Sequence, residues 1–226
     1  MIEKSKYKTL TFDCYGTLID WENGVLGYLQ PLLQSYYINT IDEFVLDLYE
    51  TLSPASQAQG GSYREVLARV MQGFATRLGF TLNDDIPGGL ADSVQYWQPF
   101  VDTVPALHVL QHDFQLGVLT NIDDDLFDTS RALLHTELDF VVTAQQVGAF
   151  KPEPQLFERA LELADGPVLH VAQNPHHDIL PATALGIDTV WINRPGVSTA
   201  TADATTGIEP TWTFGSLQEF TAAIQS

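Results

Sequence analysis

Residues 9–20 read TLTFDCYGTLID. The first four of these residues are β-prone, and they lead directly into the polar turn DCYGT, which starts at Asp13. A strand that delivers an aspartate into a loop at its C-terminal end is typical of the functional edge of open α/β sheets. The stretch therefore predicts an α/β fold with a functional site at the end of the first strand.

The chain changes character after this strand. Apolar residues recur at helical spacing, and no β-prone run interrupts them. Ser62 followed by Glu65 three residues later resembles a capping box, and residues 53–62 (SPASQAQGGS) are interpreted as a loop between two helices. We therefore expect a helical cap inserted between two parts of a catalytic core. The cap is residues 21–96, and the core is residues 1–20 and 97–226.

Strands and helices alternate again after Pro105. The β-prone runs lie at residues 114–119, 140–143, 168–172 and 189–192, with helical segments between them. This alternation favours a Rossmann-like parallel sheet flanked by helices. A stretch rich in Thr and Ala, residues 196–207, is expected to form a loop.

The composition restricts the partners and the location of the protein. The chain has 29 acidic residues against 10 Lys and Arg, a formal net charge of −19. Nucleic acid binding needs clustered cations, so we expect no nucleic acid partner. The excess of carboxylates indicates either a solvated surface that maintains solubility or adaptation to high salt. No apolar stretch leads from the N-terminal lysines to a cleavage site, so we expect no signal peptide. No apolar run is long enough to cross a bilayer, and Cys14 is the only cysteine, so we also expect a cytoplasmic protein that does not bind membranes.

Polar side chains that can carry chemistry follow four of the predicted strands or lie close to strand ends. They are Asp13 with Thr17, Thr120 with Asn121, Lys151, and Asn174 with Asp178. Because the C-terminal ends of parallel strands share one edge of a sheet, we expect these side chains to converge. Each type also has a structural interpretation, since threonines stabilise turns and Asp178 precedes a predicted helix that it can cap.

These residues lie in four motifs that resemble those of the haloacid dehalogenase superfamily. The motifs are FDCYGTLID at residues 12–20, LTN at residues 119–121, Lys151-Pro152, and HVAQNPHHD at residues 170–178. The resemblance runs over nearly the whole chain and implies a hydrolase. It also implies a Rossmann-like core with a cap inserted just after the first motif, which agrees with the helical spacing described above.

The resemblance implies roles for individual residues. Asp13 is the nucleophile, and Lys151 is the counter-ion that keeps the Asp13 carboxylate ionised and oriented. Asp178, together with Lys151, activates or positions the attacking water. Thr17 and Thr120 donate hydrogen bonds to the carboxylate of Asp13 or of the substrate. The residues that contribute to substrate binding alongside Thr120 are Tyr15, Asn121 and Asn174.

Two departures from the superfamily pattern select a branch of it. Its phosphatases carry a second aspartate two residues after the nucleophile as a proton donor, and another at the start of the fourth motif as a Mg²⁺ ligand. Tyr15 and Gln173 stand at these positions. A halide leaving group does not need a proton donor. With neither carboxylate present, the motifs resemble those of the metal-free L-2-haloacid dehalogenases. We therefore expect no cofactor and no metal, and a small-molecule anionic substrate: a 2-haloalkanoate converted to a 2-hydroxyalkanoate through an aspartyl ester.

Several alternatives stay open. The dehalogenases carry a cap arginine that takes the halide, but no Lys or Arg lies between Trp21 and Ser62, so either Arg64 replaces it in the substrate pocket or apolar and amide groups do. His176 and His177 are either proton shuttles or polar loop residues. The alternative functions are a Mg²⁺-dependent small-molecule phosphatase and a non-catalytic binding protein with the same fold. Proteins that resemble this branch are often dimers, so a homodimer is one option for the assembly.

Overall fold

Six parallel strands form the centre of the computed structural model, which describes residues 2–83, 89–195 and 209–226. From edge to edge the strands are β3 (Phe140–Thr143), β2 (Gln115–Thr120), β1 (Thr9–Asp13), β4 (Val168–Ala172), β5 (Asp188–Ile192) and β6 (Trp212–Phe214). The central strand β1 is buried along its whole length, and its Phe12 lies opposite Val118 of β2 and Val171 of β4. The predicted α/β fold is confirmed, and the C-terminal ends of β1, β2 and β4 lie side by side.

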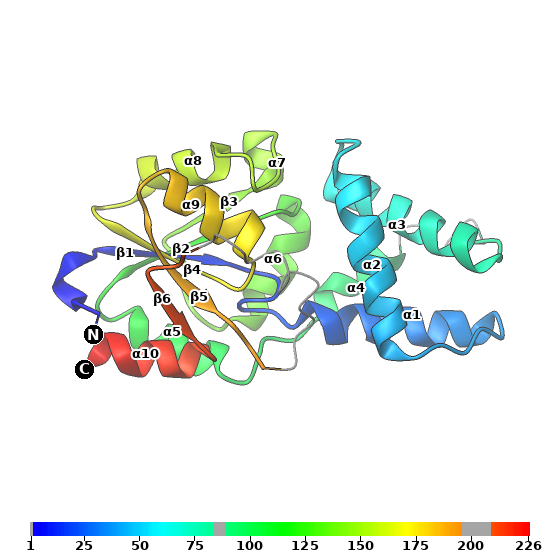
Figure 1. Ribbon diagram of the computed structural model, residues 1–226, viewed down its shortest axis with the longest axis horizontal. Coiled ribbons are helices and arrows are strands. Elements are labelled where there is room, and N and C mark those ends of the chain that lie inside the picture. Colours follow the sequence, from blue (N-terminus) through cyan, green and yellow to red (C-terminus); the bar gives the residue numbers. More distant parts are fainter. Residues whose placement is uncertain (1, 84–88, 196–208) are drawn as a thin grey trace.

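Helices cover both faces of this sheet. On one side lie α8 (Gln155–Leu163) and α9 (Leu180–Ala184), and on the other lie α5 (Thr103–Leu110) and α10 (Leu217–Gln225) (Figure 1). The shorter or peripheral elements are η1 (Lys4–Lys6), α6 (Asp124–Leu133), α7 (Ala144–Val147) and the π-helical turn η3 (Pro175–Ile179). The η3 turn begins close to the end of β4 and therefore lies at the same edge as the end of β1.

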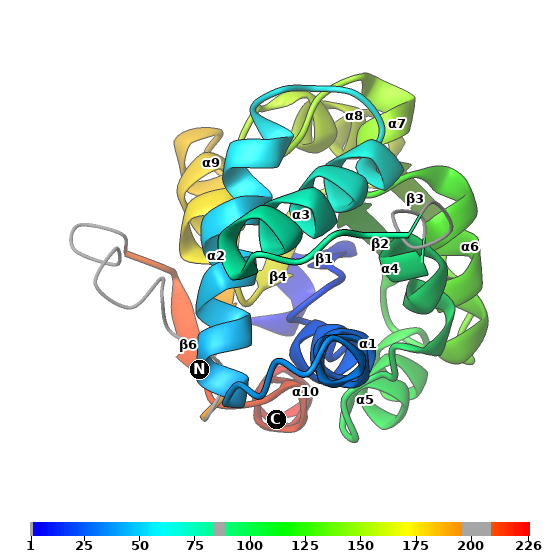
Figure 2. The same cartoon turned by 90° about the vertical axis from the view of Figure 1, so that its right-hand side faces the viewer.

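Residues 21–96 contain only helices in their described part, and this segment is called the helical insert. Its elements are α1 (Trp21–Ser35), α2 (Asp42–Gln57), α3 (Tyr63–Leu78), α4 (Gly89–Ser93) and η2 (Val94–Tyr96). The insert lies beyond the C-terminal ends of the central strands, as Figures 1 and 2 show from two directions. Phe74 of α3 and Phe12 of β1 belong to one continuous hydrophobic cluster, so apolar packing links the insert to the sheet.

The insert differs from the expectation at one helix end. Residues 53–62 are not a loop throughout, because α2 continues through Pro54 for a further turn. Pro54 lacks an N–H group, but its carbonyl accepts a hydrogen bond from Ala58 N at 3.0 Å, so the last turn still forms. The capping box is confirmed, since Ser62 Oγ accepts from Glu65 N at 3.2 Å while Ser62 N donates to Glu65 Oε2 at 2.8 Å.

The C-terminal part contains two elements that the sequence pattern does not predict, β6 and α10. β6 has only three residues, and none of them is fully buried, so it lacks a clear apolar signature. α10 starts after Ser216, whose hydroxyl accepts a hydrogen bond from Glu219 N at 3.1 Å. The expected loop over residues 196–207 lies outside the described residues. Among the described helices, none combines the length and the apolar character that a membrane span requires.

Candidate active site

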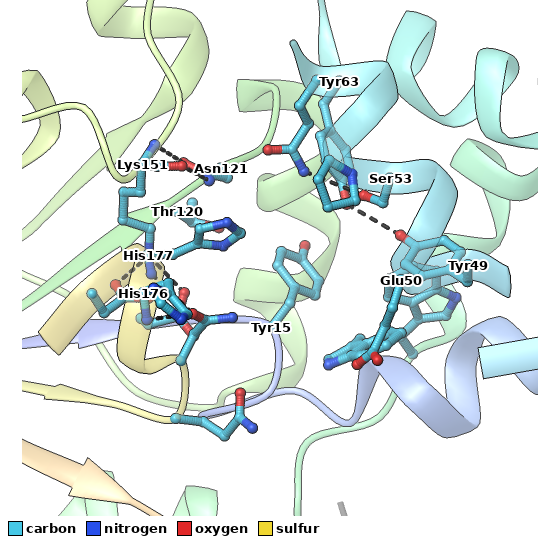
Figure 3. A pocket seen from close by; sticks show the side chains of 18 residues that line it. Tyr15, Tyr49, Glu50, Ser53, Tyr63, Thr120, Asn121, Lys151, His176 and His177 are labelled. Atoms are coloured by element: carbon cyan, nitrogen blue, oxygen red, sulfur yellow. Dashed lines mark hydrogen bonds and ion pairs between the residues drawn. The ribbon is translucent and has the colours of Figure 1, made fainter. Parts of the chain in front are cut away.

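The C-terminal edge of the sheet faces a cavity of about 420 Å³, which residues of the helical insert also line (Figure 3). The predicted site residues in its wall are Asp13, Tyr15, Thr120, Asn121, Lys151, Asn174 and Asp178. Thr17 is fully buried and lies in contact with Asp13. The structure therefore brings eight of the nine predicted site residues together, and the exception is Arg64.

Both oxygens of the Asp13 carboxylate have a hydrogen-bond donor. Lys151 Nζ donates to Oδ1 at 2.7 Å, and Thr17 Oγ1 donates to Oδ2 at 2.7 Å. Thr17 Oγ1 in turn accepts from Gln173 N at 2.8 Å, which fixes the direction of its own proton. Asp13 is thus a carboxylate of defined orientation that borders the cavity.

A tight turn after Asp13 returns Thr17 to this position. Gly16 adopts a φ of 103°, which residues with a Cβ rarely reach. Its N–H donates to Ile19 O at 2.8 Å and closes the turn. The glycine of the DCYGT sequence is therefore needed for the contact between Thr17 and Asp13.

Lys151 is buried, with 2% of its surface exposed, and its ammonium group has three acceptors. Besides Asp13, they are Asp178 Oδ1 at 2.6 Å and the carbonyl of Leu119 at 3.0 Å. The Asn121 side chain holds the backbone of Lys151, accepting from Lys151 N at 2.6 Å and donating to Lys151 O at 3.0 Å. Asn121 therefore positions Lys151, although the sequence suggested a contact with the substrate.

Asp178 has a second partner, His170, which the sequence pattern does not reveal. The His170 Nε2 atom lies 3.1 Å from Asp178 Oδ1, and its Nδ1 atom lies 2.9 Å from Thr11 Oγ1. Asp178 Oδ2 is buried and has no hydrogen-bond partner among the described residues. The available signal was a histidine in the middle of the buried strand VLHVA, because a buried polar side chain needs partners.

The two carboxyl groups respond differently to this environment. Burial raises the pKa of Asp13 above its usual range, while Lys151 opposes that shift and Asp178 adds to it. Burial also acts to raise the pKa of Asp178, but Lys151 and His170 outweigh it, so the pKa of Asp178 is lowered. Burial acts to lower the pKa of Lys151, yet the two carboxylates raise it overall, so the ammonium group stays charged. The site therefore holds a permanent cation between two acids.

Three further predicted residues differ in the hydrogen bonds that their side chains make. The Tyr15 hydroxyl lies 2.8 Å from Ser130 Oγ, and burial raises the pKa of Tyr15 well above its usual value. Thr120 Oγ1 is buried and has no hydrogen-bond partner among the described residues. Asn174 Oδ1 accepts from the backbone N–H groups of His176 and His177 at 3.0 and 2.9 Å, so it caps the η3 turn.

The position of Arg64 differs from the expectation that this residue contributes to the substrate pocket. Its guanidinium group binds Asp125 at 2.6 Å and Asp92 at 2.9 Å, with 42% of the side chain exposed, and Arg64 does not line the cavity. Its own N–H group and that of Tyr63 donate to the buried carboxylate of Asp123, both at 2.9 Å. Arg64 therefore links the insert to the core, because nearby surface acids capture its side chain.

The wall that the insert contributes is aromatic and polar. Trp21 of α1 and Tyr49 of α2 stack with ring centroids 5.2 Å apart, and the hydroxyl groups of Tyr49 and Tyr63 lie 3.3 Å apart. Ser53 and Gln57 follow Tyr49 at intervals of four residues on α2, so all three share one helix face towards the cavity. The sequence does not reveal this face, because Pro54 and the small residues around it are typical of the loop expected over residues 53–62.

The donor set of the site fits a divalent cation poorly. Tyr15 and Gln173 supply no carboxylate, and the two acids of the motifs, Asp13 and Asp178, are both ion-paired with Lys151. Magnesium prefers an octahedral set of hard oxygen ligands that are free to coordinate it. Among the described residues, no group of three or more His, Cys, Asp or Glu side chains has a metal-binding arrangement.

Comparisons with known proteins identify the family of the chain. The family model of haloacid dehalogenase-like hydrolases matches residues 7–186. The chain is 32% identical over 127 residues to the pyrimidine 5'-nucleotidase YjjG of Escherichia coli (strain K12), a match that covers 54% of each protein. The chain spans about half the length of the curated relatives it matches.

Two solved structures share the fold over almost the whole chain. The L-2-haloacid dehalogenase PA0810 has a TM-score of 0.80 at 22% identity, with 96% of this chain and 98% of that chain covered. The putative HAD-hydrolase YfnB from Bacillus subtilis, bound to magnesium, has a TM-score of 0.80 at 18% identity, with 98% and 100% covered. A dehalogenase and a magnesium-bound protein thus share one architecture, so the fold alone does not select the reaction. The family match spans most of the sequence, and the chain belongs to the haloacid dehalogenase-like hydrolases.

Proposed function

We propose that this hydrolase is a metal-independent 2-haloacid dehalogenase with Asp13 as its nucleophile. The observation that carries the proposal is the state of Tyr15, two residues after Asp13. The Tyr15 hydroxyl is hydrogen-bonded to Ser130, and burial raises the pKa of Tyr15 well above the usual value. A group that retains its proton so firmly is a poor general acid for a departing alkoxide. A halide, in contrast, leaves as a stable anion without a proton.

The proposed reaction has two steps. An oxygen of Asp13 forms a bond to the α-carbon while the carbon–halogen bond breaks and the halide leaves with the electron pair. Water then adds to the ester carbonyl of Asp13, the bond between Cγ and the bridging ester oxygen breaks, and that oxygen, which came from Asp13, leaves as the hydroxyl group of the 2-hydroxy acid. Lys151 supports the first step because its ammonium group, 2.7 Å from Oδ1, favours the ionised carboxylate against burial.

The substrate is proposed to be a small anion that binds on the core side of the cavity. Thr120 supports this, because its buried hydroxyl lacks a partner and can donate to a substrate carboxylate. Among the described residues that line the cavity, Lys151 is the only lysine or arginine, and none of them is an arginine of the insert. The aromatic face of Trp21, Tyr49 and Tyr63 is then the surface opposite the reacting carbon.

Metal independence is part of the proposal, and the donor set supports it. With both acids paired to Lys151, the ammonium group supplies the positive charge beside the nucleophile. The second candidate is a Mg²⁺-dependent small-molecule phosphatase, which the similarity to the Escherichia coli nucleotidase favours. A phosphatase reaction in this site requires a proton donor other than Tyr15.

The organisation of the chain around this site is also proposed. Residues 21–96 act as a cap over a catalytic core of residues 1–20 and 97–226, because the cavity lies between the insert and the strand ends. A cytoplasmic location and a homodimer stay predictions.

A paired assay tests the function. Halide release from 2-haloacids and phosphate release from generic phosphate esters are measured, each with and without EDTA. The proposal predicts halide release that EDTA does not reduce and that added Mg²⁺ does not increase. Phosphate release that EDTA stops and Mg²⁺ restores would establish the phosphatase instead.

A further inference from the structure

We propose that His177 is the general base that activates water for hydrolysis of the Asp13 ester. This inference rests on the proposed function, because it concerns the second step of that reaction. The superfamily resemblance assigns water activation to Asp178, so the proposal gives this role to a different residue.

Asp178 is poorly placed to accept a proton from water. Its Oδ1 atom already accepts from Lys151 at 2.6 Å and lies 3.1 Å from His170 Nε2. Its Oδ2 atom is buried and, like Thr120 Oγ1, has no hydrogen-bond partner among the described residues. Lys151 and His170 also lower the pKa of Asp178 against the effect of burial, and a weaker base abstracts a proton less effectively at neutral pH. Asp178 is therefore better suited to hold Lys151 in place.

His177 has the opposite properties. Its side chain lines the cavity and lies near Thr120 (Figure 3). No hydrogen bond joins either nitrogen of its ring to another residue in the described part of the chain. Its backbone N–H is fixed by Asn174 Oδ1 at 2.9 Å within the η3 turn. The ring is thus anchored through its backbone and has both nitrogens available for water.

The charges around His177 favour the neutral ring that a base requires. Burial lowers the pKa of His177 below its usual value; Lys151 and His176 act in the same direction, and Asp178 and Asp13 oppose it. The residues with ionisable side chains that line the cavity from the insert are Tyr49, Glu50 and Tyr63. The ring is therefore unprotonated at about neutral pH, where a histidine with the ordinary pKa of about 6.5 is still partly charged.

The proton inventory of the step balances. The water oxygen bonds to Cγ of Asp13 while one water proton moves to the imidazole. When the tetrahedral intermediate collapses, the bond between Cγ and the bridging ester oxygen, which originated from Asp13, breaks, and the imidazolium returns the proton to that alkoxide. The carboxylic acid left on Asp13 then ionises beside Lys151, and the site returns to its starting state.

The test follows a single turnover of 2-chloropropanoate with enzyme in excess. Halide is measured, and acid-quenched protein is analysed by intact-mass and peptide mass spectrometry. In His177→Gln we expect the halide burst to persist, since displacement needs no base, while ester hydrolysis slows at least ~10²-fold. The ester then accumulates on the peptide that contains Asp13. The matched control is His176→Gln, from the same turn, in which no ester accumulates.

The burst reports folding, because a misfolded variant releases no halide. A second variant, His177→Ala, tests the chemistry separately, since added imidazole should restore its hydrolysis step. If His177→Gln and His177→Ala clear the ester at the wild-type rate, His177 is not the base. If the wild-type protein releases no halide and forms no ester, the proposed function itself is refuted, and the role of His177 falls with it.

Discussion

Replacing Lys151 with methionine keeps the length of a buried side chain and removes its ammonium group. Two carboxylates, 2.7 and 2.6 Å from that group, then lose their counter-ion, and the Leu119 carbonyl loses a donor at 3.0 Å. Leaving buried charge uncompensated costs about 3–5 kcal/mol. We expect a loss of that size in the free energy of unfolding at about neutral pH, and a fall in turnover of at least ~10²-fold.

The pH dependence has a defined sign. The pKa of Asp178 is lowered in the folded protein, so its ionised form contributes stability above the ordinary aspartate pKa of about 4. That contribution is lost as the pH falls through the lowered folded value. In Lys151→Met the pKa values of both acids rise, and protonation relieves the repulsion between them. The stability deficit of the variant should therefore shrink between about pH 7.5 and about pH 5, and the acidic limb of kcat/KM should move to higher pH.

Urea unfolding at the two pH values, followed by tryptophan fluorescence, measures this difference, and halide release measures the rate. The control is Lys8→Met, which removes an exposed lysine just before β1. A deficit below about 1 kcal/mol at neutral pH, the size expected for an exposed ion pair, would refute the reasoning. A deficit that grows on acidification would also refute it.

Three other substitutions have expected outcomes. Asp13→Asn should abolish halide release and leave the urea midpoint close to that of the wild type; wild-type turnover would remove Asp13 as the nucleophile. Asp123→Ala should destabilise the protein by about 1–2 kcal/mol in urea unfolding, because the N–H groups of Tyr63 and Arg64 lose their acceptor; an unchanged midpoint would contradict this. Arg64→Ala should change kcat/KM by less than about threefold, since its ion pairs lie at the surface; a much larger loss would return Arg64 to the substrate pocket.

The convergence of the site could be predicted because it depends on topology. Asp13 and Thr120 end two parallel strands, and that fact places them at one edge whatever their neighbours are. The same reasoning brought Lys151 and Asp178 to this edge. The contact of His170 could not be predicted in this way, because Asp178 comes next to His170 only when the η3 turn folds back over the end of β4.

Side-chain direction in the helical insert could not be predicted. The Arg64 side chain binds Asp92 and Asp125, which lie 28 and 61 positions away in the sequence, and no local sequence pattern predicts such distant partners. The cavity face of α2 was hidden by Pro54, because proline and the small residues around it are typical of loops. Tertiary packing retained the helix there and turned Gln57 to the cavity.

A single turnover in H₂¹⁸O tests the covalent role of Asp13 most directly. Enzyme in excess converts a 2-haloacid once, and ¹⁸O is located by mass spectrometry in the product and in the peptide that contains Asp13. Because water adds to the ester carbonyl, the label should enter the Asp13 carboxylate, and the 2-hydroxy acid should carry an unlabelled oxygen that came from Asp13. A product labelled in this first turnover, with an unlabelled Asp13, would mean that water attacks the substrate directly and would contradict the account.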